Sequence, residues 1–298
     1  MSTEKRSSTW KAWMLAIRPR TLPAAAAGVI MGSALAWGDG FFRLDAALTC
    51  LLTAVLLQIG SNLANDVFDF ERGADTPQRS GPVRVTQARL LTPSQVKAGM
   101  AVVFGLATLL GLYLAWLGGW PIILVGIAAI LSAIAYTGGP FPLGYYGLGD
   151  LFVFIFFGVA AVAGTYYVQA GFVSAAAWWM AIPPGLIITA ILVVNNLRDM
   201  ENDRKAGKRT LAVILGERST KYQYLLCMIV AYLVMPIAAF TSVIPWLSVL
   251  SWLSMPLAIR AARIVLTQQG RPLNSALAGT GQTAILFSIL FWLGIALN

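Results

Sequence analysis

Acidic and amide side chains recur at helical spacing in one short stretch of the sequence, "SNLANDVFDFERGAD", residues 61–75. Asn62, Asp66 and Asp69 lie three or four positions apart, so on a helix they occupy one face. The stripe continues to Arg72, and it directly follows a long apolar run. The pattern therefore predicts carboxylates at the end of a hydrophobic helix.

A second stretch, "NNLRDMENDRKAGKR" at residues 195–209, repeats this arrangement. Asn195, Asp199 and Asp203 are four positions apart, and this stretch too places an Asn one helical turn before an Asp. Two clusters with matched spacing, each at the end of an apolar run, indicate that their side chains converge on one site.

Converging carboxylates repel one another unless a cation lies between them. The chain contains no histidine, which excludes histidine-ligated zinc or haem and Ser-His-Asp catalysis. Oxygen ligands suit Mg²⁺, which typically binds one or two carboxylates together with the phosphate oxygens of a substrate. The predicted metal ligands and catalytic residues are Asp66, Asp69, Asp199 and Asp203. The alternative is a set of surface ion pairs at helix ends, each contributing less than about 1 kcal/mol.

Basic residues flank both acidic clusters. Arg and Lys would neutralise the phosphate charge that a metal leaves uncompensated, so the mixture suits a metal–diphosphate complex. Positive residues at a membrane edge are also expected from topology alone, so each one has two explanations. The predicted substrate-binding set in and beside the two clusters is Asn62, Asn65, Arg72, Asp75, Arg79, Asn195, Lys205, Lys208 and Arg209.

The rest of the chain predicts membrane-spanning helices that position these clusters. The 298 residues are 58% hydrophobic and only 11% charged, against about 25% charged in soluble domains. The apolar residues form blocks long enough to cross a bilayer as helices. Nine spans are predicted, at 21–38, 45–65, 97–117, 120–136, 149–169, 175–196, 222–240, 244–260 and 276–297. We expect an all-α integral membrane protein with one domain, 1–298, whose residues 1–20 form an N-terminal arm without a cleavable signal peptide.

Positive charge predicts the orientation of these spans. Arg43 is the one basic residue, among 21, that falls outside the N-terminal arm and three long connections on the same side. Positive loops stay in the cytoplasm, so we expect a cytoplasmic N-terminus, an external C-terminus and both acidic clusters at the cytoplasmic edge. The net charge of +9 is explained by topology and gives no reason to expect a nucleic-acid partner.

One connection on that side is neutral. "YTGGPFPLGYYGLGD", residues 136–150, contains no Lys or Arg. It is read equally well as a tight hairpin between two spans or as a backbone-lined mouth on a membrane cavity.

The two acidic motifs carry a resemblance to a known family. "NDVFD" at 65–69 and "DMEND" at 199–203 resemble the paired Asp motifs of the UbiA-type intramembrane prenyltransferase superfamily, and "YTGGP" at 136–140 resembles a connection of that family. "AIRPRTLPAA" at 16–25 and the segments 65–82 and 198–216 are similar to the branch that acts on 1,4-dihydroxy-2-naphthoate in menaquinone biosynthesis. The commoner superfamily pattern has a third Asp where this chain has Gly73, so Asp75 is a less certain ligand than Asp66 or Asp69.

The resemblance implies nine helices around a central cavity that opens sideways to lipid, in the bacterial cytoplasmic (inner) membrane. It implies an Mg²⁺-dependent transfer from polyprenyl diphosphate to 1,4-dihydroxy-2-naphthoate, with loss of CO₂ and diphosphate, to give a demethylmenaquinol. Under this reading the Tyr136 ring would stabilise the prenyl cation, or it would pack against lipid or the helix core. Arg20 would meet the acceptor carboxylate or extend to the membrane interface.

Two alternatives stay open. One is a polyprenyltransferase that uses 4-hydroxybenzoate or another aromatic acceptor. The other is a cation-coupled transporter, although transporters place such carboxylates near the middle of the bilayer and not at one edge.

Overall fold

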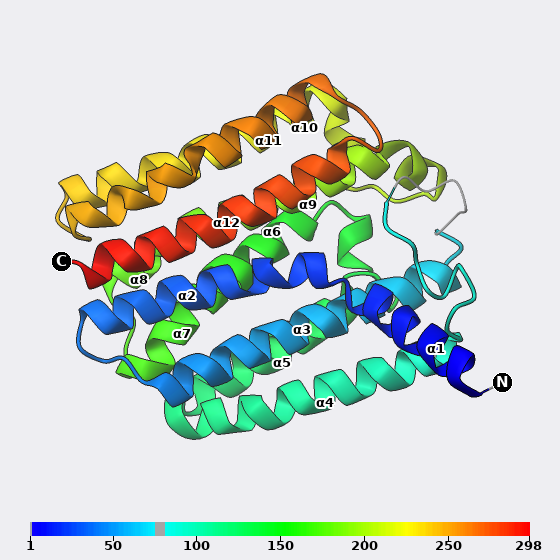
Figure 1. Ribbon diagram of the computed structural model, residues 1–298, viewed down its shortest axis with the longest axis horizontal. Coiled ribbons are helices and arrows are strands. Elements are labelled where there is room, and N and C mark those ends of the chain that lie inside the picture. The colour runs from blue at the N-terminus through cyan, green and yellow to red at the C-terminus, as the bar shows by residue number, and fades with distance from the viewer. Residues whose placement is uncertain (1, 75–80) are drawn as a thin grey trace.

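The structure is a computed structural model that describes residues 2–74 and 81–298, with side chains from Thr9 onward. Every regular element in the described part of the chain is helical, which confirms the predicted all-α class. The long helices lie side by side along the longest axis of the molecule (Figure 1). The two termini lie at opposite ends of this bundle (Figure 1).

Eight helical segments are long and apolar enough to cross a membrane. They are Thr9–Gly38, Leu44–Glu71, Pro93–Gly118, Gly149–Ala170, Ala175–Lys205, Leu211–Phe240, Trp246–Thr267 and Leu273–Ala296. A ninth apolar helix, Trp120–Ala135, is shorter. The nine predicted spans all correspond to helices, and their count depends on whether this short helix is included.

The element bounds divide several of these segments. The principal elements are α1 (Ser2–Ile17), α2 (Leu22–Gly38), α3 (Leu44–Glu71), α4 (Pro93–Gly118), α5 (Trp120–Ala135), α6 (Gly149–Val153), η3 (Phe154–Ala160), α7 (Ala161–Ala170), α8 (Ala175–Met180), α9 (Ile182–Lys205), α10 (Leu211–Phe240), η4 (Trp246–Ser254), α11 (Met255–Thr267) and α12 (Leu273–Ala296). The three-residue turns η1 (Pro19–Thr21) and η2 (Leu143–Tyr145) complete the list. Several helices run well past the predicted spans, and α3 and α9 include the acidic stripes in their last turns.

The end of α3 depends on a glycine. Gly73 has φ +69°, in the left-handed region that favours glycine, and Ala74 donates its backbone N–H to the carbonyl of Asp69 at 2.9 Å. This termination occupies the position at which the commoner superfamily pattern has its third Asp. The chain consequently turns back there, and residues 84–86 return to the end of α3.

Small residues allow the helices at the centre of the bundle to approach closely. A Cβ atom placed on Gly28 of α2 would lie 2.5 Å from the Cβ of Ala161 in α7. Gly32, one turn further, would meet the carbonyl oxygen of Val162 at the same distance. In a membrane, helices associate through such close packing, because burial of apolar surface alone drives helix association only weakly.

Candidate active site

The acid-bearing ends of α3 and α9 lie at the same end of the bundle as α1 (Figure 1). Asp66 of α3 is 1% exposed. Its two carboxylate oxygens accept backbone N–H groups at 3.0 Å, Oδ2 from Val85 and Oδ1 from Thr86. The guanidinium of Arg18 lies 3.9 Å from Oδ2. Asp66 therefore holds the returning segment and the N-terminal arm against the end of α3.

Asp69 joins three parts of the chain. Its Oδ1 accepts hydrogen bonds from the Lys208 ammonium at 2.8 Å and the Tyr145 hydroxyl at 2.9 Å. Its Oδ2 accepts from Arg84 at 3.1 Å. Lys208 follows α9, so this bond connects the segment after the second acidic stripe to the first stripe. The predicted convergence of these two segments is supported by a direct contact.

The neutral connection 136–150 packs against the acid-bearing end of α3. Arg72 donates from Nε to the carbonyl of Thr137 at 2.9 Å, and from Nη2 to the carbonyl of Gly139. The Thr137 hydroxyl donates to Asn65 at 3.0 Å. The Lys208 ammonium lies 4.7 Å from the ring centroid of Tyr145. This connection therefore forms part of the wall beside the acids, which favours the mouth over an isolated hairpin.

The second acidic stripe is organised by Arg198. Its guanidinium donates to both oxygens of Asp199, at 2.9 and 2.6 Å, and also to Asn195 at 2.8 Å. A further bond of 2.7 Å reaches Asn274 in α12. Arg198 and Asp199 are both buried, whereas Asp203 is half-buried. Buried pairing of this kind fixes the orientation of the carboxylate, because breaking it would leave a buried charge uncompensated.

Tyr136 caps the C-terminus of α5, and acids of both stripes act on the pKa of its hydroxyl. Burial raises the pKa of its hydroxyl, and the charges of Asp150, Asp69 and Asp203 raise that pKa further. These three acids belong to different elements: Asp69 to α3, Asp203 to α9 and Asp150 to the start of α6. Asp150 is absent from the sequence prediction.

The other predicted residues divide into three groups. Asn62 is buried and donates to the carbonyl of Ile17 at 2.9 Å and to the Thr21 hydroxyl at 3.0 Å, which ties the N-terminal arm to α3. The side chains of Arg20, Lys205 and Arg209 are exposed. Asp75 and Arg79 lie outside the described residues.

Several site residues were missed by sequence reasoning. They are Arg18, Arg84, Tyr145 and Arg198, each within 4 Å of a predicted acid through a polar atom. In the sequence, topology alone accounts for Arg18, Arg84 and Arg198, and Tyr145 belongs to a connection with no periodic pattern. Arg18 carried one local signal, its place before Pro19 at the start of a span.

The donor chemistry of the site fits Mg²⁺. Asp66, Asp69, Asp199 and Asp203 offer carboxylate oxygens, the ligand type that Mg²⁺ prefers. Among residues 2–74 and 81–298, no three acidic or cysteine side chains lie close enough to hold an ion by themselves. A substrate phosphate would complete such a coordination shell, in keeping with the usual sharing of Mg²⁺ between carboxylates and phosphates.

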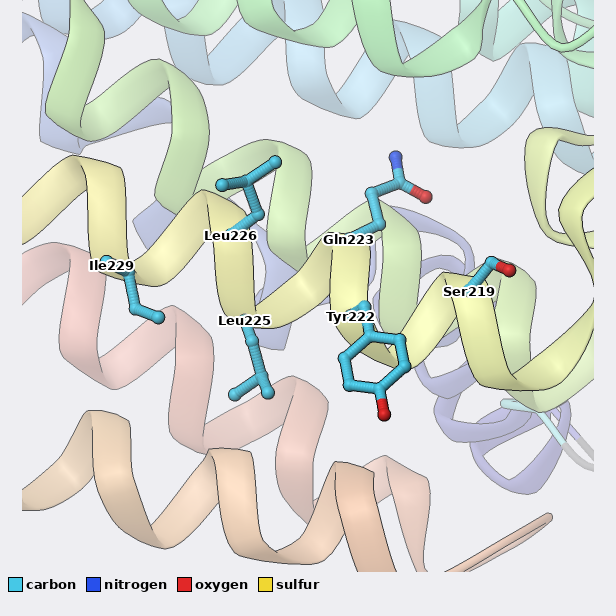
Figure 2. Close-up of a pocket in the computed structure, with 6 residues that line it drawn as sticks. All are labelled: Ser219, Tyr222, Gln223, Leu225, Leu226 and Ile229. Carbon is cyan, nitrogen blue, oxygen red and sulfur yellow. The ribbon is translucent and has the colours of Figure 1, made fainter.

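A separate depression of about 540 Å³ lies along α10. Its lining is Ser219, Tyr222, Gln223, Leu225, Leu226 and Ile229 (Figure 2). It contains none of the predicted site residues, so the carboxylate site is not this surface pocket.

Comparison with known proteins places the chain in a family. The sequence pattern of the UbiA prenyltransferase family matches residues 25–284. The chain is 39% identical to 1,4-dihydroxy-2-naphthoate octaprenyltransferase of Escherichia coli, over 99% of this chain and 98% of that protein. It is 40% identical to the protein of the same name from Mycobacterium tuberculosis, over 93% of this chain and 94% of the other.

Solved structures share the fold. A UbiA homolog from Archaeoglobus fulgidus bound to DMAPP and Mg²⁺ has a TM-score of 0.65 at 13% identity, over 96% of this chain and 99% of that one. The apo structure of a UbiA homolog from Aeropyrum pernix K1 has a TM-score of 0.69 at 17% identity, over 95% and 97% of the two chains. The apolar helices, the paired acidic stripes and these matches agree: this multi-pass membrane protein belongs to the UbiA prenyltransferase family.

Proposed function

We propose that this protein transfers a polyprenyl group from polyprenyl diphosphate to 1,4-dihydroxy-2-naphthoate, with loss of CO₂ and diphosphate, as a single membrane domain. The observation that carries the proposal is the bond between Lys208 and Asp69, which brings the two acid-bearing segments together among basic side chains. Support for the acceptor comes from full-length relatives named 1,4-dihydroxy-2-naphthoate octaprenyltransferase. The demethylmenaquinol product would serve menaquinone biosynthesis.

The acids and bases of the site would bind the diphosphate end of the donor. Asp66, Asp69, Asp199 and Asp203 would hold Mg²⁺, which when bound supplies positive charge against the diphosphate. Lys208 contacts Asp69 and would bind phosphate oxygens directly. Phosphate binding would then replace the bond from Lys208 to Asp69.

Bond breaking and bond making follow from this placement. The allylic C–O bond of the donor breaks with its electron pair leaving on the diphosphate, and an electron-rich ring carbon of the acceptor attacks the prenyl carbon. The carboxylate on the attacked carbon then leaves as CO₂, and its electron pair restores the aromatic ring. The apolar helix walls would exclude water from the cation-like group, and the Tyr136 ring would stabilise it.

We infer that the site faces the cytoplasm. The basic connections lie at the end of the bundle that carries α1, and positive loops remain cytoplasmic. The C-terminus would lie on the external side.

The test is prenyl transfer by the purified protein in detergent, with one polyprenyl diphosphate and either 1,4-dihydroxy-2-naphthoate or 4-hydroxybenzoate. We expect prenylated product and CO₂ with the naphthoate, loss of activity with EDTA and recovery with Mg²⁺. Replacing Asp69 or Asp199 by Asn is expected to lower kcat/KM at least 100-fold, roughly the effect of losing several kcal/mol of transition-state stabilisation.

Asp45→Asn provides the control, since Asp45 lies in the first turn of α3 at the opposite end and pairs with Arg43. Transfer to 4-hydroxybenzoate alone would overturn the acceptor assignment. Unaltered Mg²⁺-dependent transfer by the Asn variants would overturn the site.

A further inference from the structure

Asp150 is an acid inside an apolar span, at the start of α6. Its Oδ2 accepts a hydrogen bond of 3.1 Å from the side-chain amide of Gln223. Its Oδ1 is enclosed, and within the part of the chain that the structure describes it meets no hydrogen-bond donor. A carboxylate oxygen enclosed without a donor is costly, and ionisable groups in membrane spans are usually functional.

The position of Asp150 relates it to the two acidic stripes. The hydroxyl of Tyr136 packs against the neighbouring Gly149, where a Cβ atom would lie 2.8 Å from the hydroxyl oxygen and 3.2 Å from Leu192 of α9. Leu192 precedes Asp199 by seven residues, or about 10 Å along a helix. Asp150 therefore lies beside Tyr136, about two helical turns along α9 from Asp199 and further from the end of the bundle than the two stripes.

Gln223 holds this carboxylate from a different helix. It belongs to α10, and Figure 2 shows its side chain pointing away from Tyr222 and Leu225 of the same helix. The Thr189 hydroxyl of α9 adds a contact of 3.5 Å to the backbone carbonyl of Asp150. One oxygen is thus anchored across helices, and the second has no donor among the described residues.

We propose that Oδ1 of Asp150 is the catalytic group that accepts the proton of the acceptor's ring hydroxyl adjacent to its carboxylate. This inference rests on the proposed function, and it names the residue that activates the acceptor.

The proton transfer balances within one turnover. As the ring carbon attacks the prenyl carbon and the C–O bond breaks toward diphosphate, the hydroxyl proton passes to Asp150 and the hydroxyl becomes a ring ketone. The attacked carbon then carries a carboxylate β to that ketone. Its C–C bond breaks, CO₂ leaves, and the electron pair flows to the ketone oxygen. Asp150 returns the proton to that oxygen, so no net proton is consumed.

The first experiment compares Asp150→Asn with wild type and with Asp45→Asn as the matched acid-to-amide control. Asn keeps the size of the side chain and an oxygen for Gln223, but it cannot take up the proton. General-base groups typically contribute about 100- to 10,000-fold, so we expect kcat to fall at least 100-fold. The donor KM and the unfolding temperature are expected to match wild type.

The second experiment uses acceptor analogues in which a methyl group replaces the proton of one ring hydroxyl. In 1-methoxy-4-hydroxy-2-naphthoate the hydroxyl beside the carboxylate is blocked, and 4-methoxy-1-hydroxy-2-naphthoate is the matched control. Wild type should lose activity with the first analogue and retain it with the second. Asp150→Asn should show no further loss with the first analogue, because the two changes remove one interaction.

The outcomes separate this inference from the proposed function. If wild type transfers no prenyl group to 1,4-dihydroxy-2-naphthoate, the proposed function fails. If wild type is active and Asp150→Asn is equally active, the role of Asp150 is wrong. Additive losses from the variant and the 1-methoxy analogue, or a lowered unfolding temperature with equal losses for every acceptor, would show a structural role and overturn the proposal.

Discussion

The Lys208 ammonium donates a 2.8 Å hydrogen bond to Oδ1 of Asp69, and these residues lie on segments 139 positions apart. The lysine side chain is 13% exposed and the aspartate 3%, so the pair is protected from water on both sides. Tyr145 contacts both members of the pair. Its hydroxyl donates to the same oxygen of Asp69, and its ring lies beneath the Lys208 ammonium. A mobile surface charge would not be held by two partners in this way.

Removing Lys208 should impair the reaction with the donor. A hydrogen bond to a charged group contributes about 1.5–3 kcal/mol, so Lys208→Ala should lower kcat/KM for the prenyl diphosphate about 10- to 100-fold. Arg204→Ala is the control, because Arg204 pairs with Glu201 on an exposed face of the same segment. Steady-state kinetics with varied donor would measure this, and equal effects for the two variants would contradict it.

Arg18 is expected to matter more than Arg20. Arg18 has φ +54° and lies 3.9 Å from Asp66, whereas the Arg20 side chain is exposed. A bulky residue in the left-handed region costs of order 1–3 kcal/mol, a strain found mainly at functional sites. Arg18→Gly should therefore raise or preserve the unfolding temperature while lowering activity at least 10-fold, by about 1.4 kcal/mol or more.

Arg20→Gln supplies the comparison in the same assay. If it lowers activity as much as Arg18→Gly does, the predicted contact of Arg20 with the acceptor gains support. Calorimetry and prenyl-transfer kinetics on the same preparations would decide the matter.

The close packing of α2 on α7 predicts a stability difference between two glycines. Gly28→Val would force new atoms against Ala161, and overpacking typically costs about 1–3 kcal/mol. Gly105→Val is the control, since a Cβ atom there would meet no other atom within 4 Å. Thermal unfolding in detergent should show a lower transition temperature for the first variant alone, and equal transitions would contradict the packing.

The proposed orientation can be measured by labelling single cysteines. In a background with Cys50→Ser and Cys227→Ser, a cysteine placed at Asn298 should react with an impermeant maleimide in intact cells. A cysteine at Thr9 should react only after the membrane is opened, because positive segments stay cytoplasmic. The reverse labelling pattern would place the site on the external side.

The sequence by itself determined the membrane class and the approximate spans, and it supplied the prediction of four acids as metal ligands. Each of these rests on local regularity: apolar blocks of bilayer length, acids at helical spacing and basic residues confined to one set of connections. The resemblance in the two acidic motifs then identified the family correctly. Local pattern suffices here because a helix in lipid forms its backbone hydrogen bonds within itself. The length of the helix and the residues on each of its faces can therefore be read from consecutive residues.

Only the tertiary structure decided which side chains meet those acids. Arg84, Tyr145 and Arg198 show no periodic signal, and Asp150 looks like a single charge at a helix start. Arg84 and Tyr145 reach Asp69 from other segments, Gln223 of α10 reaches Asp150, and Arg198 adds a bond to Asn274 of α12 to its contacts within α9. Such contacts between segments depend on how the helices pack together. The spacing within one helix carries no information about that packing, because it is set by contacts between helices that are distant in the sequence.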